Sequence, residues 1–375
     1  MPGLLADIDP DGLLEYSVVY TDRALNHMSK SFQGVMNDIS TTLKAVYSAS
    51  AVVVVPGSGT FGMEAVARQF ATGKKCLIIR NGWFSFRWSQ IFEMGDIPSD
   101  CIILKAQRAD GDKHAAFAPA PIEKVVAAIQ AEKPDFVFAP HVETASGIIL
   151  PDDYIQAVTD AVHEVGGLMV LDCIASGAIW VDMQESGVDI LISAPQKGWS
   201  GSPCAGLVML GPLARERIES TTSTSFACDL GKWLQIMEAY ESGGHAYHAT
   251  MPTDALTRFR DMMKETEGYG LVRARTQQQE LGARVRALLT GMGIKSVAAE
   301  GFQAPGVVVS YTEDKDIHSG KRFLDAGLQI AAGVPLQCDE PDDFQTFRIG
   351  LFGLDKLQNV DRTAASLEEA LNKIL

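Results

Sequence analysis

Two side chains that follow neighbouring apolar segments have the chemistry of a carbonyl-dependent active site. Asp172 directly follows the apolar residues 168–171, and Lys197 comes shortly after residues 190–192. Ligands of open α/β sheets bind beyond the carboxyl ends of the strands, so we expect both side chains in one cleft. There a lysine can form an imine, and a buried carboxylate can keep a pyridine nitrogen protonated. Each residue alone has a simpler interpretation, because most lysines are exposed and an aspartate here can cap the next helix.

A glycine-rich turn adds a candidate phosphate site. Residues 56–60, Pro-Gly-Ser-Gly-Thr, lie between an apolar segment and a helix expected over residues 61–70. Backbone N–H groups and a hydroxyl at a helix N-terminus bind phosphate well. The turn is not a P-loop, because no Gly-Lys-Ser/Thr follows it. A plain glycine-rich turn is the alternative interpretation.

An aromatic segment follows the second apolar run. Residues 81–88 read Asn-Gly-Trp-Phe-Ser-Phe-Arg-Trp. An aromatic ring at this strand end could stack on a planar cofactor. A surface cluster of aromatic rings that pack on one another is the competing interpretation.

Taken together, these segments resemble class V aminotransferases of fold type I, particularly the alanine/serine–glyoxylate aminotransferase group, from about Asn26 to the end of the chain. The resemblance implies pyridoxal 5′-phosphate (PLP) as cofactor and Lys197 as the catalytic residue that holds it as a Schiff base. It also implies that Asp172 partners the pyridine nitrogen and that Phe84 stacks on the ring.

The same resemblance extends to residues 141–147, His-Val-Glu-Thr-Ala-Ser-Gly. This segment matches one whose hydroxyl, here that of Thr144, lies near the cofactor in the family. The other cofactor-binding residues implied in this half of the chain are Ser58, Gly59, Thr60 and Gln196.

Two later segments resemble the rest of such a site. Residues 246–252, Ala-Tyr-His-Ala-Thr-Met-Pro, imply that Tyr247 and Thr250 reach the cofactor phosphate of the neighbouring subunit. The resemblance therefore implies a homodimer with shared active sites. The same residues also suit a helix entry, with Thr250 as cap and a proline near the helix start. The second segment is residues 347–353, Phe-Arg-Ile-Gly-Leu-Phe-Gly, and its Arg348 resembles the arginine that binds the substrate carboxylate. The planar fork of donors of an arginine suits a carboxylate.

The N-terminal part departs from the family pattern. The family usually opens with a Gly-Pro-rich stretch and a Gly-His-x-Ser turn near the substrate, whereas this chain reads Asn-His-Met-Ser from Asn26 and lacks the earlier stretch. Asn26 is therefore a candidate substrate-binding residue in an altered pocket. The bulky side chains of Trp83, Phe86 and Trp88 indicate a tightened or restructured pocket mouth.

The resemblance implies an aminotransferase that moves an amino group from alanine or serine to glyoxylate or pyruvate. Lys197 would act as general base and acid at the substrate Cα. A 2-aminoethylphosphonate-type donor is the runner-up. A cysteine desulfurase-like lyase is a further alternative, but it would typically place histidines where this chain has Gln196 and Phe84, and its only hint of a reactive cysteine is Cys338. A non-catalytic relative used for binding would be expected to have lost the cofactor residues, which are present here.

The elements that position these residues alternate along the chain. Nearly continuous apolar runs predict buried strands at residues 51–55, 76–79, 136–139, 168–171, 190–192 and 205–210. Most are separated by helix-length segments, which predicts a mainly parallel sheet with helices on both faces. The pattern changes near residue 252. We therefore expect a large cofactor-binding domain over residues 1–252 and a small α+β domain over residues 253–375. The extreme N-terminus of the large domain can pack on the small one.

Composition narrows the class of partner. The formal net charge of −15 argues against nucleic acid, because phosphates would be repelled. The start of the chain lacks the basic and apolar regions of a signal peptide, and no apolar stretch reaches the length of a membrane span. Six widely spaced cysteines form no CxxC pair, so no metal site or disulfide is expected. We expect a cytoplasmic enzyme that acts on small molecules, an amino donor and an oxo-acid acceptor, without a membrane partner.

Overall fold

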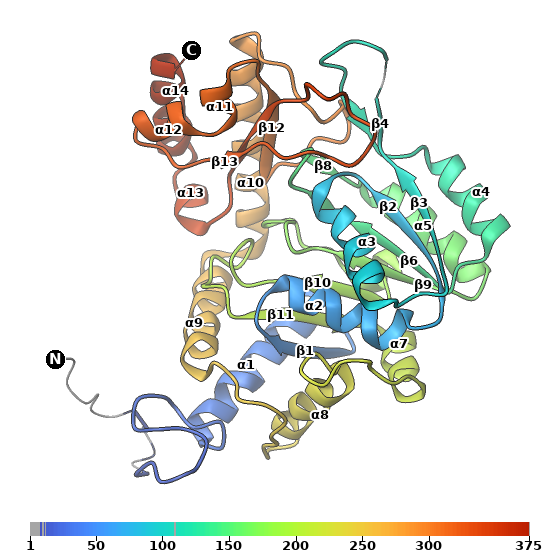
Figure 1. Ribbon diagram of the computed structural model, residues 1–375. Coiled ribbons are helices and arrows are strands. Elements are labelled where there is room, and N and C mark those ends of the chain that lie inside the picture. The colour runs from blue at the N-terminus through green and yellow to red at the C-terminus, as the bar shows by residue number, and fades with distance from the viewer. Residues whose placement is uncertain (1–7, 10, 12, 109, 375) are drawn as a thin grey trace.

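The computed structural model describes residues 8–374 apart from 10, 12 and 109. Its centre is a seven-stranded sheet in the order β1-β11-β10-β9-β6-β2-β3 (Figure 1). The strands are β1 (Ala51–Pro56), β2 (Lys75–Arg80), β3 (Asp100–Lys105), β6 (Phe136–Pro140), β9 (Leu168–Asp172), β10 (Ile190–Ser193) and β11 (Ala205–Leu210). Only β11 runs against its neighbours, and the other neighbouring pairs are parallel.

The mainly parallel sheet and its six predicted strands are confirmed, and β3 is an additional strand that the sequence analysis did not predict. β3 forms the edge of the sheet and is only partly buried, whereas β6, β9 and β10 are buried along their whole length. An edge strand exposes more of its side chains to water. Its sequence, which begins and ends with a charged residue, therefore lacks the uninterrupted apolar run of the central strands.

Helices cover both faces of the sheet (Figure 1). α2 (Gly59–Val66) and α3 (Trp83–Gly95) lie on one face, and α4 (Ile122–Glu132) and α5 (Asp152–Glu164) lie on the other. α2 starts two residues before the predicted helix and continues as a π-helical turn over Ala67–Ala71. The remaining helices of this part are α1 (Lys30–Tyr47), α6 (Met183–Ser186), α7 (Pro212–Arg217) and α8 (Leu230–Glu241).

The C-terminal part has its own small sheet, in the order β12-β14-β13. Its strands are β12 (Val307–Tyr311), β13 (Ala331–Ala332) and β14 (Thr346–Gly350), and its helices include α10 (Leu271–Gly291), α11 (Lys315–His318), α12 (Lys321–Asp325), α13 (Leu354–Gln358) and α14 (Val360–Ile374). The short strand pairs β4 (Gln107–Arg108) with β5 (Phe117–Ala118), and β7 (Val142–Glu143) with β8 (Ile148–Ile149), complete the structure. This α+β unit was predicted.

The long helical segment after residue 252 is broken at Gly270, whose φ of 104° ends α9 (Thr253–Tyr269). Leu256 and Phe259 of α9 belong to the hydrophobic core beneath the large sheet. Leu281 of α10 belongs to the core of the smaller unit. The helical pair thus joins the two cores, and the exact domain boundary at residue 252 stays a prediction.

Among the described residues, no helix combines the length and apolar character that crossing a membrane requires.

Candidate active site

A cavity of about 450 Å³ opens where the carboxyl ends of the central strands face the smaller unit. Its wall comes from both sides: the turn before α2 and the loops after β9 and β10 face residues of β13 and β14. The sequence-predicted residues that line it are Ser58, Gly59, Thr60, Phe84, Thr144, Asp172, Gln196, Lys197 and Arg348. Tyr247, Thr250 and Asn26 are not part of its lining.

Lys197 lies in the loop after β10, with its Nζ 5.0 Å from the centre of the Phe352 ring. Burial lowers the pKa of the Lys197 amine, and the positive charge of Arg348 lowers it further. Both effects favour the neutral amine, which is the nucleophilic form. The loop packs tightly at Gly198, where a Cβ would lie 2.1 Å from the carbonyl oxygen of Gly177.

Asp172 is the last residue of β9 and is only 7% exposed. It pairs in register with Ile192 of β10, so the loop that carries Lys197 begins beside it. Its carboxylate accepts a hydrogen bond of 2.9 Å from the backbone N–H of Ile174. Burial nevertheless raises the pKa of Asp172 to about 7, because the charged form loses its hydration. A cationic ring nitrogen beside it would restore the ionised form.

The turn before α2 leaves polar groups free for a ligand. Ser58 is the N-cap residue of α2, but its side chain makes no capping hydrogen bond. Thr60 accepts a hydrogen bond of 2.9 Å from Nη1 of Arg87. At Gly59 a Cβ would lie 2.6 Å from Cδ1 of Ile174, so a glycine allows the turn to approach the loop after β9. The open helix N-terminus and these hydroxyls form a suitable cradle for a phosphate.

Phe84 is held by a buried carboxylate at the start of α3. Glu143 is fully buried and accepts hydrogen bonds from the backbone N–H groups of Phe84 (3.3 Å) and Ser85 (2.8 Å) and from the Ser85 hydroxyl (2.8 Å). It also accepts one from the backbone of Ala145. A negative group at a helix N-terminus is stabilised by the unpaired N–H groups there. Glu143 therefore fixes the first turn of α3 and, with it, the Phe84 ring.

Arg348 reaches the cavity from β14, on the smaller unit. Its Nε donates a hydrogen bond of 2.7 Å to the carbonyl oxygen of Ala332, and its guanidinium carbon lies 5.6 Å from the centre of the Phe84 ring. Burial lowers the pKa of Arg348. No ion pair of Arg348 occurs in the part of the chain that the structure describes, so its remaining donors can meet an anionic ligand.

The family model of the class V aminotransferases matches residues 13–361. The chain belongs to this family. Alanine–glyoxylate aminotransferase of Rattus norvegicus is 24% identical over 364 residues, which cover 93% of this chain and 82% of that relative. 2-Aminoethylphosphonate–pyruvate transaminase of Burkholderia ambifaria is 26% identical over 364 residues, which cover 94% and 92%. The crystal structure of an alanine–glyoxylate aminotransferase from Nostoc sp. has the same fold, with a TM-score of 0.76 at 20% identity, and the match covers 92% of this chain and 88% of that one.

This class V aminotransferase is thus a PLP-dependent transaminase of fold type I. The cavity residues fit the cofactor in three respects. The uncapped N-terminus of α2 suits the phosphate, Asp172 suits the ring nitrogen, and Lys197 suits the aldehyde. The buried Oε1 of Gln196 also has no hydrogen-bond partner among the described residues, so this edge of the cavity has an acceptor to offer to a ligand.

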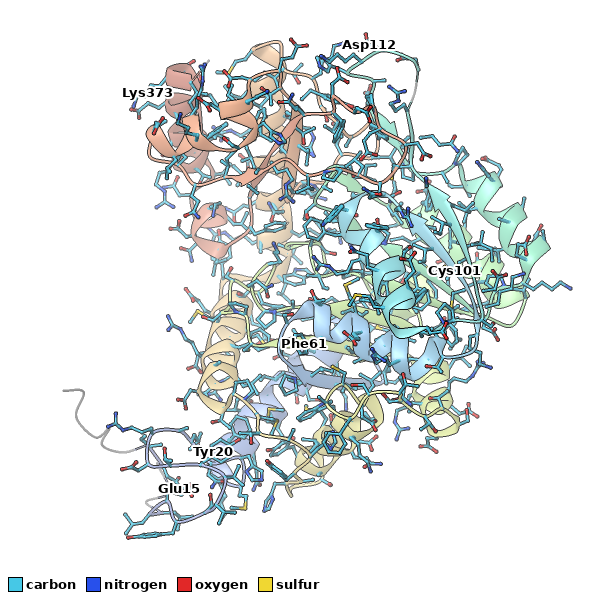
Figure 2. All side chains as sticks on the ribbon, in the orientation of Figure 1. Glu15, Tyr20, Phe61, Cys101, Asp112 and Lys373 are labelled. Atoms are coloured by element: carbon cyan, nitrogen blue, oxygen red, sulfur yellow. The ribbon has the colours of Figure 1, made fainter. Side chains whose placement is uncertain are left out.

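The predicted residues outside the cavity gather elsewhere on the aminotransferase. The hydroxyls of Tyr247 and Thr250 lie 3.1 Å apart, and Tyr247 is 54% exposed. The amide of Asn26 donates hydrogen bonds to Glu15 (2.8 Å) and Ser17 (3.1 Å). His27, the residue after Asn26, contacts the Tyr247 ring at a centroid distance of 5.5 Å. Figure 2 shows Glu15 at the outer end of the N-terminal segment, well away from Phe61 in the first turn of α2.

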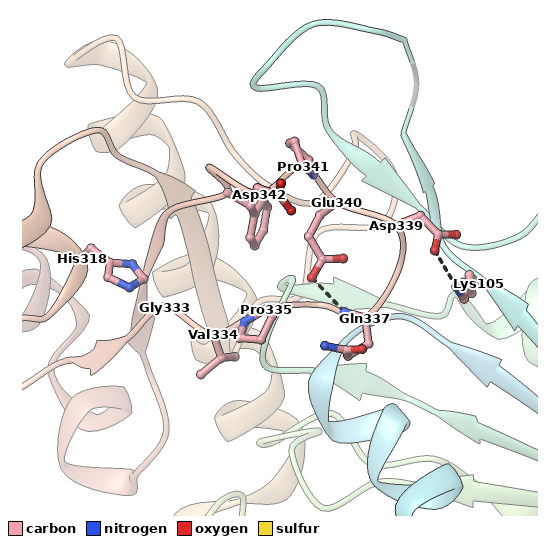
Figure 3. Close-up of a pocket in the computed structure, with 11 residues that line it drawn as sticks. Lys105, His318, Gly333, Val334, Pro335, Gln337, Asp339, Glu340, Pro341 and Asp342 are labelled. Carbon is pink, nitrogen blue, oxygen red and sulfur yellow. Dashed lines mark hydrogen bonds and ion pairs between the residues drawn. The ribbon is translucent and has the colours of Figure 1, made fainter.

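A second cavity, of about 440 Å³, lies between the smaller unit and the end of β3 (Figure 3). None of the predicted cofactor residues lines it. Its rim is the loop of residues 336–340, in which Glu340 accepts hydrogen bonds from the backbone of Leu336, Gln337 and Cys338. Lys105 pairs with Asp339 at 2.6 Å. These contacts hold the loop that contains Cys338 in place.

The sequence analysis missed three residues around the aminotransferase site. Arg87 and Phe352 line the cavity, and Glu143 holds the start of α3. Arg87 could have been found, because it lies three residues after Phe84 on a helix and therefore on the same face. Phe352 and Glu143 belong to segments already matched to the family, but their contacts depend on how distant parts of the chain pack.

Proposed function

We propose that this aminotransferase moves the amino group of a small amino acid, alanine or serine, to a small oxo acid, glyoxylate or pyruvate. The observation that carries the proposal is the single cavity that brings together Lys197, Asp172 and Arg348. An amine, a carboxylate and an arginine without an ion pair are the groups that transamination of a carboxylate-bearing substrate requires. The alanine–glyoxylate aminotransferases among the relatives support the choice of substrates.

Each side chain has a role in the proposed reaction. PLP supplies an electron sink for the bond that breaks at the substrate Cα. Arg348 binds the substrate carboxylate and thereby orients the Cα–H bond. The amine of Lys197 would take the proton from the substrate Cα as general base and return it as general acid. Asp172 would favour the protonated ring nitrogen, and Phe84 and Thr144 would hold the cofactor ring in the cavity.

The size and walls of the cavity favour small substrates. A volume of about 450 Å³ must hold the cofactor and the substrate together. The apolar side chains of Val142, Ile330 and Phe352 line the same space. A long substrate side chain directed at these three residues would therefore meet an apolar wall, and its polar groups would lose hydrogen bonds to water there.

A 2-aminoethylphosphonate donor with pyruvate as acceptor is the second candidate, supported by the Burkholderia relative. Such a donor has no carboxylate on the amine-bearing carbon and carries a phosphonate one carbon further away, and Arg348 would then bind the phosphonate. A half-reaction panel separates the candidates. The PLP-loaded protein is mixed with alanine, serine, 2-aminoethylphosphonate and larger amino acids, and the visible absorbance band of the lysine-bound cofactor is followed.

We expect alanine or serine to bleach this band fastest, and the oxo-acid products to be identifiable by mass spectrometry. Lys197→Ala should abolish the band, whereas Lys232→Ala, at an exposed site on α8, should keep it. Fastest bleaching by 2-aminoethylphosphonate would replace the first candidate by the second. No bleaching with any amine, in a protein that binds PLP, would contradict both.

We further propose a homodimer in which the group of Asn26, Tyr247 and Thr250 serves the partner's cavity. The exposure of Tyr247 and its absence from the lining of its own subunit's cavity support this arrangement. Mixing two inactive variants tests it. In a hybrid of Lys197→Ala with the double variant Tyr247→Ala/Thr250→Ala, one cavity regains every wild-type residue if sites are shared. Recovered activity in the mixture is expected, and unchanged inactivity of a verified hybrid would contradict the shared site.

We also propose a cytoplasmic location. The six cysteines are unpaired in the structure, which suits a reducing compartment. Cell fractionation with an antibody against the chain would test the proposal, and recovery in a secreted or membrane fraction would contradict it.

A further inference from the structure

We propose that Arg87 binds the phosphate of the cofactor from within the same subunit, and that two arginines divide the cavity between two anions. Arg87 takes the cofactor phosphate, whereas Arg348 takes the substrate carboxylate. The inference rests on the proposed function, because it assigns a further residue to the same site.

The contacts of Arg87 place it at the phosphate turn. Its Nη1 donates a hydrogen bond of 2.9 Å to the hydroxyl of Thr60, in the first turn of α2. Its guanidinium carbon lies 5.1 Å from the centre of the Phe84 ring. The guanidinium has five N–H donors in a planar fork, and the bond to Thr60 uses one of them. The remaining donors lie beside an uncapped helix N-terminus that already suits a phosphate.

The side chains that line the cavity carry excess positive charge, which favours anionic ligands. Arg87, Arg348 and Lys197 line it, and Asp172 is the one carboxylate among the described residues of the lining. Glu143 lies outside the lining and is bonded to the start of α3, although its charge opposes the lowering of the Arg348 pKa. The chain as a whole has a formal net charge of −15, so this concentration of positive charge is local. Partly buried cations without ion pairs are costly unless a ligand neutralises them.

The two arginines are anchored to different elements of the cavity wall, and both approach the Phe84 side chain. Arg87 extends from α3 and is bonded to the turn before α2. Arg348 extends from β14 and is bonded to the backbone of Ala332, and Nη1 is 3.5 Å from the carbonyl oxygen of Thr144. Because their anchors differ, Arg87 is available to a phosphate at the turn before α2, and Arg348 is available to the carboxylate of a substrate. The turn before α2 offers only neutral donors to the phosphate. Arg87 would add a charged, bidentate contact to them.

The test compares PLP with pyridoxal, which lacks the phosphate, as ligands of the apo-protein. Dissociation constants are measured by equilibrium dialysis for the wild type and for Arg87→Gln. We expect Arg87→Gln to weaken PLP binding by about 10- to 100-fold, as for loss of a charged hydrogen-bond partner, with pyridoxal affinity nearly unchanged. Arg87→Lys should restore part of the loss. Inorganic phosphate should compete with PLP less well in Arg87→Gln than in the wild type.

Two control variants separate this role from others. Arg348→Gln should keep wild-type PLP affinity and raise the KM of the amino donor. Arg68→Gln removes a charge from the π-helical turn after α2, outside the cavity, and should change neither quantity.

Equal weakening of PLP and pyridoxal in Arg87→Gln would show a merely structural role and overturn the inference. Wild-type PLP affinity with an altered KM for the donor would overturn it as well and assign Arg87 to the substrate. In both cases the proposed function stands, whereas a wild-type protein that binds no PLP would remove the proposed function itself.

Discussion

The Nζ of Lys197 lies 5.0 Å from the centre of the Phe352 ring, although the two residues are far apart in the sequence. The ring covers the amine and limits its contact with water. A cation over an aromatic face gains about 0.5–1 kcal/mol at exposed sites, which would favour the charged form. Burial acts in the opposite direction and is the larger effect, because the pKa of Lys197 is lowered.

Phe352→Ala should therefore raise the pKa of Lys197, since water can then solvate the ammonium group. The rate of imine formation between the apo-protein and pyridoxal, measured against pH, should shift to higher pH. Phe352→Leu keeps the amine covered by an apolar side chain and should shift the profile much less. A profile that moves to lower pH in Phe352→Ala would mean that the ring, and not burial, dominates the pKa.

Asp172→Asn should change both activity and the pH dependence of stability. Burial raises the folded-state pKa of Asp172 to about 7, above its ordinary value of 3.8. Between these values the folded apo-protein retains a proton that the unfolded chain has released, so stability decreases as pH rises through this window. The destabilisation by the buried Asp172 charge is fully present above the pKa of the folded protein. It is absent below the pKa of the unfolded chain.

The asparagine variant lacks this cost. In urea denaturation its apo-form should be more stable than the wild type above pH 7, and the difference should vanish toward pH 4. Turnover of the PLP-loaded variant should fall by about 10²-fold or more, the order found when a preorganised electrostatic partner is removed. A stability difference that is the same at both pH values would contradict the buried-charge explanation.

Glu143→Ala should destabilise the start of α3. The variant leaves the backbone N–H groups of Phe84, Ser85 and Ala145 without their acceptor. Each unsatisfied buried group costs about 1–3 kcal/mol, so with three such groups we expect a loss of about 3 kcal/mol or more in the free energy of unfolding. Glu123→Ala, an exposed acidic residue in the first turn of α4, should stay within about 0.5 kcal/mol of the wild type. Equal effects of the two substitutions would contradict the role assigned to Glu143.

Gly82→Ala tests the same contact from the other side. A Cβ at Gly82 would lie 2.7 Å from Cγ and 2.8 Å from Cδ of Glu143. The backbone there is extended, so crowding is the cause of the expected loss of about 1–3 kcal/mol. In the Glu143→Ala background the same substitution should cost less, and a double-mutant cycle measures the coupling. Additive effects would show that the two residues do not meet.

Cys338→Ser should leave transamination unchanged. Cys338 is 4% exposed, and burial raises the pKa of its thiol to about 12, with Glu143 and Glu340 adding to the shift. A thiol of this kind does not supply a thiolate near neutral pH. We expect no release of sulfide when the PLP-loaded protein is incubated with cysteine. Sulfide release that is lost in Cys338→Ser would favour the desulfurase alternative.

The sequence by itself determined the parts of this protein that depend on local pattern. Apolar runs between helix-length segments predicted the parallel sheet, because only strands buried on both faces are apolar throughout. The positions of Asp172 and Lys197 after two such runs predicted that they share a cleft, and the structure places both in one cavity. The turn at residues 56–60 was recognisable because helix N-termini have their own residue preferences.

The tertiary structure alone decided which distant residues meet at that cleft. Arg348 reaches Phe84 only because β14 of the smaller unit faces the large sheet, and Glu143 meets the start of α3 only through the packing around β7. Asn26 lies outside the cavity lining, and its neighbour His27 contacts Tyr247, which its position in the sequence could not reveal. The physical reason is that periodicity and turn chemistry act over a few residues. Contacts between remote segments depend on the packing of whole elements, and so do the burial and charge that shift the pKa values of Lys197 and Asp172.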